Sequence, residues 1–121
     1  MVATPTIPRF ASLLAALEHH AAVRPDKAAL LELDHRALPK RQYTFAELRN
    51  RARKVGGALA CQHPMGARAV LMTQSVCDFA AAFIGCVYAG MVPVPASPPR
   101  SAQALQHLVR LVDDCGATLI L

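Results

Sequence analysis

The segment from residue 69 to residue 100 constrains the fold of this chain more than any other. It reads as a buried strand over 69–73, a helix over 78–90, a second strand over 91–95 and a proline-rich loop over 96–100. A continuous apolar strand is typical of a parallel sheet that helices cover on both faces. The helix is almost wholly apolar and rich in small residues, so it must be buried on most sides. The segment therefore predicts a strand–helix–strand unit of an α/β sheet.

Hydrophobic periodicity predicts the elements on the N-terminal side of this unit. Apolar residues at helical spacing from Phe10 to Ala21 predict an amphipathic helix. The runs 28–33 and 40–43 read as the two strands of a small hairpin. Thr44 is expected to cap the next helix, because its hydroxyl can accept from the amide of Glu47 while the Glu47 carboxylate reaches back to the Thr44 amide.

Three further features complete the predicted fold. Gly56 and Gly57 lie inside the second helix, and we interpret them as positions of close packing rather than as a phosphate-binding loop. Ser101 is expected to cap another helix, whose apolar stripe is Leu105, Leu108, Val109 and Val112 and which ends at Cys115-Gly116. Residues 117–121 read as a final strand. Because strands and helices alternate from residue 69 onward, the sequence predicts an α/β fold with a mostly parallel sheet, flanking helices and right-handed crossovers.

The length and composition of the chain are those of one small domain. They also suggest apolar surface that another segment or partner buries. The 121 residues are 54% hydrophobic and 17% charged, which argues against disorder. That content is high for a domain of this size, so we expect apolar surface that another segment or partner buries.

The net charge of +5 raises the question of nucleic-acid binding. Aromatic residues that could stack on bases are scarce, and no nucleic-acid-binding motif is present. We therefore interpret the basic cluster as a solvated helix face, and we expect no nucleic-acid partner. Its members on the helix are Arg49, Arg51, Arg53 and Lys54, and Lys40 and Arg41 precede them in the sequence.

An uncharged stretch over residues 79–99 is long enough to raise the question of a membrane span. Four prolines at 93, 95, 98 and 99 exclude one continuous helix across it. The helical part is expected to end near Gly90, so the sequence predicts no membrane span. No secretion signal is recognised at the N-terminus, because Pro5 and Pro8 interrupt it and no positively charged segment precedes the short apolar run.

The cysteines and histidines do not form a metal-binding pattern. Cys61, Cys77, Cys86 and Cys115 make no C-x-x-C pair, and Cys77 and Cys86 read as small buried hydrophobic residues in a reducing cytoplasm. His19 and His20 are adjacent on a helix and are expected to point in different directions, which argues against a shared metal. The remaining histidines, His35, His63 and His107, are isolated. The carboxylates of Asp113 and Asp114 could bind a cation, but we interpret them as solvated or capping carboxylates.

Two residues are candidates for a chemical site. Ser75 follows a strand and precedes a helix, but no G-x-S-x-G surrounds it, so we interpret it as a helix N-cap or loop serine rather than a nucleophile. Arg100 follows a parallel strand at the edge where α/β sheets often bind ligands, and its alternatives are ligand contact or a local ion pair. Neither G-x-x-x-x-G-K nor G-x-G-x-x-G occurs.

An ordered set of segments carries a family resemblance, namely residues 10–30, 43–48, 78–90 with 93–95, and 114–121. Taken in order, they resemble the start of the large domain of acyl-adenylate-forming enzymes, and most closely the fatty acyl-AMP ligases. Pro98-Pro99-Arg100 is similar to the fatty acyl branch, whereas amino-acid-activating relatives usually carry an acidic residue before a lone proline. Ser97 departs from the fatty acyl branch, which often has an aromatic residue there.

This resemblance implies an incomplete domain: a leader over residues 1–8, then the N-terminal part of an AMP-binding (adenylation) domain over residues 9–121, truncated at its C-terminus. The parent enzyme would use ATP and Mg²⁺ to activate a fatty acid for transfer to an acyl carrier protein. By the same resemblance, the Ser/Thr/Gly-rich loop, the acidic metal ligand and the lid lysine lie beyond Leu121. We therefore assign no catalytic, cofactor-binding or metal-binding residue within this chain, and we expect the fragment alone to be inactive and to bind none of these cofactors.

Two alternatives stay open at this point. The chain could belong to an amino-acid-activating or acyl-CoA-forming relative. It could also be a non-catalytic α/β interaction module.

Overall fold

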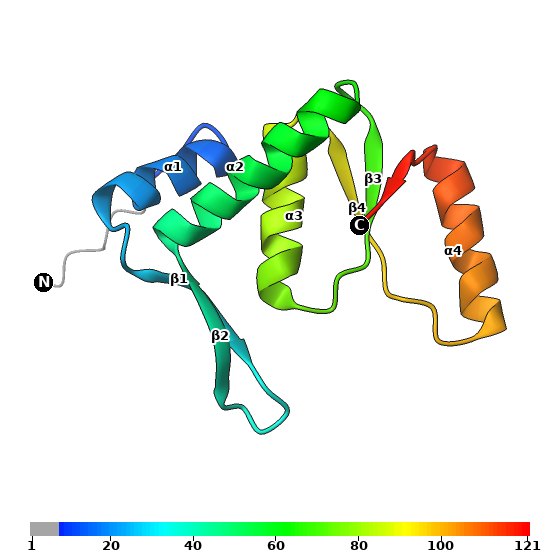
Figure 1. Cartoon of the computed structure of the whole chain (residues 1–121), viewed down its shortest axis with the longest axis horizontal. Helices are drawn as coiled ribbons and strands as arrows, with labels where there is room; N and C mark the ends of the chain where they lie inside the picture. The colour runs from blue at the N-terminus through cyan, green and yellow to red at the C-terminus, as the bar shows by residue number, and fades with distance from the viewer. Residues whose placement is uncertain (1–7) are drawn as a thin grey trace, which may run out of the picture.

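The computed structural model describes residues 8–121, so residues 1–7 of the predicted leader lie outside the described part (Figure 1). Helices and strands alternate along most of the chain, as the sequence predicts. The elements in order are α1 (Leu13–Val23), β1 (Ala28–Leu33), β2 (Pro39–Thr44), α2 (Phe45–Gln62), β3 (Arg68–Leu71), α3 (Val76–Tyr88), β4 (Val92–Pro95), α4 (Ala102–Cys115) and β5 (Leu119–Ile120).

The strands form two separate sheets. β1 and β2 pair as the antiparallel hairpin that the sequence predicts. β3, β4 and β5 form a parallel sheet in the order β4-β3-β5, which confirms the predicted parallel crossovers. This sheet stands between α3 and α4 (Figure 1). Because β3 is the central strand and is covered on both faces, Ala69, Val70 and Leu71 are fully buried.

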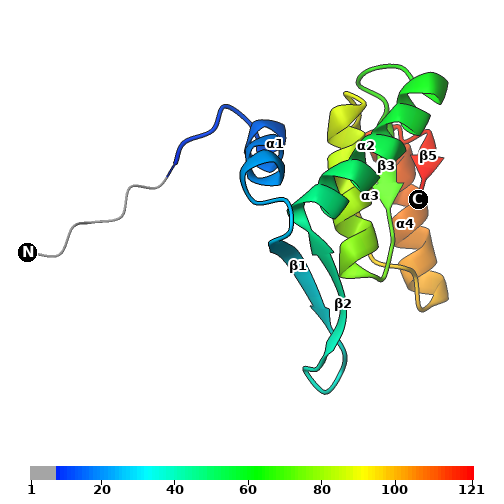
Figure 2. The same cartoon turned by 60° about the vertical axis from the view of Figure 1, so that its left-hand side comes forward.

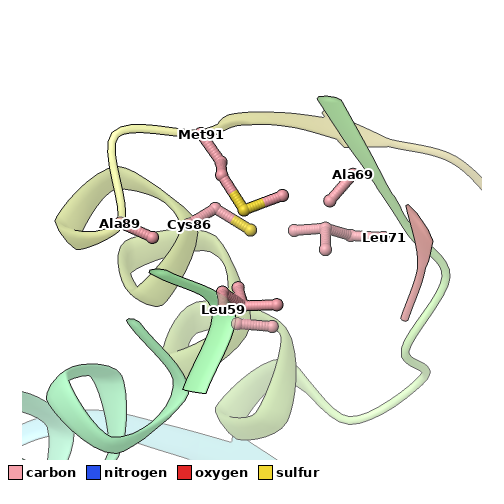
Figure 3. Packing of buried hydrophobic residues seen from close by; sticks show 7 residues of the cluster. Leu59, Ala69, Leu71, Cys86, Ala89 and Met91 are labelled. Atoms are coloured by element: carbon pink, nitrogen blue, oxygen red, sulfur yellow. The ribbon is translucent and has the colours of Figure 1, made fainter. Parts of the chain in front are cut away.

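The main core lies between β3, α2 and α3 (Figure 3). Ala69 and Leu71 point from one face of β3 toward this helix pair, as the alternation of a strand requires. The residues that meet there are Leu59, Ala69, Leu71, Ala82, Cys86, Ala89 and Met91. A second cluster joins α1, the hairpin and the other side of the helix pair through Leu17, Tyr43, Leu48, Ala52, Cys77 and Ile84. The buried thiols confirm the prediction for Cys77 and Cys86.

α2 and α3 approach each other closely at two glycines. A Cβ on Gly56 would lie 2.8 Å from the Cβ of Tyr88 and 2.9 Å from the carbonyl oxygen of Gly85. A Cβ on Gly85 would lie 2.6 Å from Cγ1 of Val55. The predicted close packing is therefore confirmed for Gly56. It is wrong for Gly57, because a Cβ on that residue would face away from α3 and would meet no atom within 4 Å.

Polar caps set the helix boundaries. Thr44 and Glu47 form the predicted capping box, and Ser101 accepts from the amide of Ala104. Ser12 caps α1, so this helix begins at Leu13, and the prediction that it includes Phe10 was wrong. Gly116 ends α4 with φ of 65°, a left-handed conformation that glycine adopts without strain.

α4 differs from the other helices because none of its residues is buried. Its predicted apolar stripe is only partly covered, and Leu105 and Val109 are 50% and 52% exposed. On the neighbouring β5, Ile120 is 49% exposed. Among residues 8–121, none of the helices combines the length and the apolar character needed to cross a bilayer.

Candidate functional site

The carboxyl ends of the parallel strands define the edge of the sheet where α/β proteins usually bind ligands. β3 and β4 run in the same direction, so the loops 72–75 and 96–100 leave the sheet at this edge. The backbone of the loops is tied to the sheet by hydrogen bonds from the Ala96 amide to the Leu71 carbonyl and from the Met72 amide to the Leu121 carbonyl. One buried polar atom lies here without a hydrogen-bond partner, the hydroxyl oxygen of Thr73.

Ser75, at the end of the first of these loops, has two structural roles. Its hydroxyl oxygen accepts from the Asp78 amide at 3.3 Å, which confirms that it is the N-cap of α3. The same hydroxyl donates to the carboxylate of Glu32 on β1 at 3.0 Å. Glu32 is only 8% exposed, so this hydrogen bond supplies a partner to a buried carboxylate. Ser75 therefore joins the hairpin to the start of α3 and is not placed as a nucleophile.

A second contact between the hairpin and α3 is an ion pair. Arg41 Nη1 lies 3.1 Å from Asp78 Oδ1, and Arg41 Nη2 donates to the Tyr43 hydroxyl at 2.6 Å. The hydrogen bond to Asp78 raises the pKa of Arg41, so the guanidinium stays charged. Together with Ser75 and Glu32, these residues form a polar cluster that fixes the hairpin beside the carboxyl edge.

Another polar cluster holds α1, α2 and α3 together at a distance from this edge. Glu18 accepts from the Tyr88 hydroxyl and forms an ion pair with Arg53 at 2.7 Å. The hydrogen bond from Tyr88, together with Arg53, lowers the pKa of Glu18. Burial, followed by the hydrogen bond to Glu18, raises the pKa of Tyr88. Both pKa shifts favour an ionised Glu18 that accepts a hydrogen bond from a neutral Tyr88. We interpret this pair as a structural contact between helices.

The two adjacent histidines lie in an aromatic cluster. The rings of His19 and His20 meet edge to face at 5.3 Å between centroids, so the prediction that they point apart was wrong. Phe10 contacts both rings, and Phe45 contacts His20. Nδ1 of His20 is buried without a hydrogen-bond partner, and burial lowers the pKa of His20, as do the nearby cations Arg24 and Lys27.

Metal-binding side chains do not gather in the described part of the chain. Within residues 8–121, no three histidine, cysteine or acidic side chains approach closely enough to hold an ion. Asp113 and Asp114 are both exposed at the end of α4, as solvated carboxylates are. His35 and His107 are exposed, and His63 is half-buried.

Arg100 lies at the carboxyl edge but is exposed. Among residues 8–121 it makes neither an ion pair nor a side-chain hydrogen bond, so the predicted local ion pair is absent. The exposed guanidinium is therefore available at the edge.

The basic cluster on α2 is only partly a solvated face. Arg53 pairs with Glu18, and the guanidinium of Arg51 lies 5.1 Å from the centre of the Tyr43 ring. Both residues nevertheless remain exposed, as the predicted solvated face requires, whereas Arg49 is half-buried. Lys54 stays exposed.

Sequence reasoning missed the polar contacts between the hairpin and α3, which involve Glu32, Arg41, Tyr43 and the exposed Asp78. One signal was available: Glu32 interrupts an apolar strand at a position whose side chain must point to the same face as Leu30. The identity of its partner on α3 follows only from the tertiary fold, because Ser75 lies 43 residues away.

Comparison with known proteins identifies the class. The family described as AMP-binding enzyme matches residues 17–121. The chain is 30% identical to the medium-chain-fatty-acid–[acyl-carrier-protein] ligase JamA of Moorena producens over 94% of its length, which is 20% of that protein. It is 32% identical to the long-chain-fatty-acid–AMP ligase FadD32 of Mycolicibacterium smegmatis, over 94% of this chain and 19% of that protein.

A solved structure agrees with these relatives. The fatty acyl-adenylate ligase of L. pneumophila, in complex with acyl adenylate and pyrophosphate, superposes with a TM-score of 0.81 at 26% identity. The match covers 90% of this chain and 19% of the other. The chain therefore belongs to the AMP-binding enzyme family of adenylate-forming ligases. Within that family its similarity is to fatty acyl-AMP ligases, as the resemblance implied, and it spans about a fifth of the length of the relatives it matches.

Proposed function

We propose that this chain is the N-terminal part of a fatty acyl-AMP ligase. The complete enzyme would join a fatty acid to ATP, giving an acyl-adenylate and pyrophosphate, and would then pass the acyl group to the phosphopantetheine thiol of an acyl carrier protein with release of AMP. The similarity to JamA and FadD32 over 94% of the chain is the observation that carries this proposal.

We propose that the described residues hold neither ATP nor Mg²⁺ by themselves. No acidic cluster gathers in residues 8–121, and the lysines at 27, 40 and 54 all precede the parallel sheet. Arg100 is the one cationic side chain in the loops 72–75 and 96–100. We therefore assign no catalytic, cofactor-binding or metal-binding residue here, and we propose that residues 9–121 serve as a scaffold that is inactive alone.

The scaffold would be completed by the remainder of the adenylation domain. Leu105 and Val109 leave an apolar strip on the outer side of α4, and Ile120 lies half-exposed on the strand at one edge of the sheet. Surfaces of this kind are normally buried, because an exposed apolar strip or strand edge promotes association. The four free thiols support a reducing, cytoplasmic location.

The test is fatty-acid-dependent exchange of labelled pyrophosphate into ATP, measured on the complete protein that contains this chain. Exchange that requires a fatty acid and needs no carrier protein supports the proposal. Exchange that requires an amino acid instead, or product formation only with coenzyme A, overturns the fatty acyl-AMP ligase assignment. The 121-residue chain measured alone should give no exchange, and detectable exchange would contradict the scaffold role.

A further inference from the structure

The outer face of the β1–β2 hairpin combines apolar and cationic side chains. We call it the hairpin surface and define it by Leu31, Leu33, Arg36, Leu38 and Lys40. The three leucines are 51%, 49% and 56% exposed, and both cations are exposed. A shallow depression in the hairpin is lined by Leu31 and Lys40, together with Pro39, Arg41 and Gln42.

The carboxylates of the hairpin are not available on this surface. Glu32 is buried on the inner face, where it accepts from Ser75. Asp34 accepts from the amides of Arg36 and Leu38 within the turn. Among residues 8–121, neither Arg36 nor Lys40 forms an ion pair, so both cationic side chains of the hairpin surface are open to a partner.

The hairpin is also held in a fixed position. The hydrogen bond between Ser75 and Glu32 and the ion pair between Arg41 and Asp78 fasten its inner face to α3. In both views the hairpin tip points toward the same side of the molecule as the loops at the carboxyl edge of the parallel sheet (Figures 1 and 2). A protein that approaches this edge would therefore meet the hairpin surface beside it.

We propose that the hairpin surface docks the acyl carrier protein, an acidic partner with apolar residues at the centre of its contact. This inference rests on the proposed function, because the carrier thiol must reach the acyl-adenylate. Arg36 and Lys40 supply the charge complementarity, which steers association and sets the orientation of the partner. The exposed leucines supply the apolar contact area that charged residues alone lack.

A binding experiment with two matched charge reversals tests the proposal. The probe is a fluorescently labelled holo-acyl carrier protein of fatty acid synthesis, titrated with the 121-residue chain and separately with the complete protein. Lys40→Glu removes a cation from the hairpin surface, whereas Lys54→Glu makes the same change at an exposed position on α2. We expect Lys40→Glu to raise the Kd about fivefold, the upper range for one exposed charge contact. Lys54→Glu should leave the Kd within about twofold of wild type, and added salt should weaken wild-type binding.

Three results would overturn the proposal: no binding of the carrier protein by either wild-type form, equal affinities of the two variants, or binding of anionic phosphatidylglycerol vesicles in place of the carrier protein. Pyrophosphate exchange needs no carrier protein, so it reports on the proposed function separately. Lys40→Glu should leave exchange by the complete protein unchanged. If the wild-type complete protein binds the carrier protein but shows no exchange, the ligase assignment is refuted and the docking surface is not.

Discussion

The packing of α2 against α3 gives the sharpest prediction about stability. Gly56 and Gly57 are adjacent in α2, yet only Gly56 faces the partner helix. A methyl group on Gly56 would meet the Tyr88 Cβ at 2.8 Å and the Gly85 carbonyl oxygen at 2.9 Å. Both atoms belong to the helix framework and cannot rotate away, so the helices must separate to admit the alanine. The same methyl group on Gly57 meets nothing within 4 Å.

The magnitudes follow from opposing effects. Overpacking costs about 1–3 kcal/mol, and because the neighbours of Gly56 are rigid we take the cost at this position as about 3 kcal/mol. Alanine gains about 1 kcal/mol over glycine in a helix. We therefore expect Gly56→Ala to destabilise the chain by about 2 kcal/mol and Gly57→Ala to stabilise it by about 1 kcal/mol. At about 4 °C per kcal/mol for a domain of this size, the Tm should fall by about 8 °C in the first variant and rise by about 4 °C in the second.

Thermal denaturation of the wild type and both variants measures this difference directly. Gly85→Ala offers a second check, because its new methyl group would meet the β-branched side chain of Val55 at 2.6 Å. It should also lower the Tm. Equal Tm values for Gly56→Ala and Gly57→Ala would refute the close approach of the two helices.

Other substitutions test the polar cluster, the histidine and the exposed helix. Ser75→Ala removes a helix cap worth about 1 kcal/mol. It also removes the hydrogen-bond donor to buried Glu32, which is worth about 1–3 kcal/mol. Urea denaturation should therefore show a larger loss of unfolding free energy for Ser75→Ala than for Ser101→Ala, which removes an exposed cap alone. Because the pKa of His20 is lowered in the folded state, the unfolded state binds more protons than the folded state as the pH falls below about 6.5, and folding loses stability. Between pH 7.5 and pH 5.5 the Tm of the wild type should therefore fall more than the Tm of His20→Phe. Equal decreases would contradict the burial of Nδ1 of His20 without a hydrogen-bond partner. Leu105→Gln should reduce light scattering by the isolated chain without lowering its Tm, because this leucine is half-exposed.

Local sequence signals predicted the order and type of the elements well. Periodicity and capping chemistry are sufficient where a signal depends on residues close together in the chain. Examples are the apolar run that begins at residue 69, the glycine at 90 that follows the helix, and the capping box at Thr44. The boundaries were less accurate where a cap competes with periodicity. Phe10 fits the helical spacing of α1, but Ser12 caps the helix, which begins at Leu13, and Phe10 instead contacts the two histidine rings at tilted and edge-on angles.

The contacts between distant segments could not be predicted. Glu32 and Ser75 meet because β1 lies beside the start of α3, and no local pattern specifies that arrangement. The same holds for Glu18 and Tyr88, which are 70 residues apart. Gly56 and Gly57 show the limit most clearly, because they are alike in the sequence and only the position of α3 separates their roles.

We propose above all that the protein containing this chain activates fatty acids as adenylates. The most direct test is pyrophosphate exchange by the complete protein, compared across a fatty acid, an amino acid and no added acid. We predict exchange with the fatty acid alone, together with a bound acyl-adenylate that mass spectrometry detects in the absence of coenzyme A. No fatty-acid-dependent exchange by a folded complete protein would contradict the proposal.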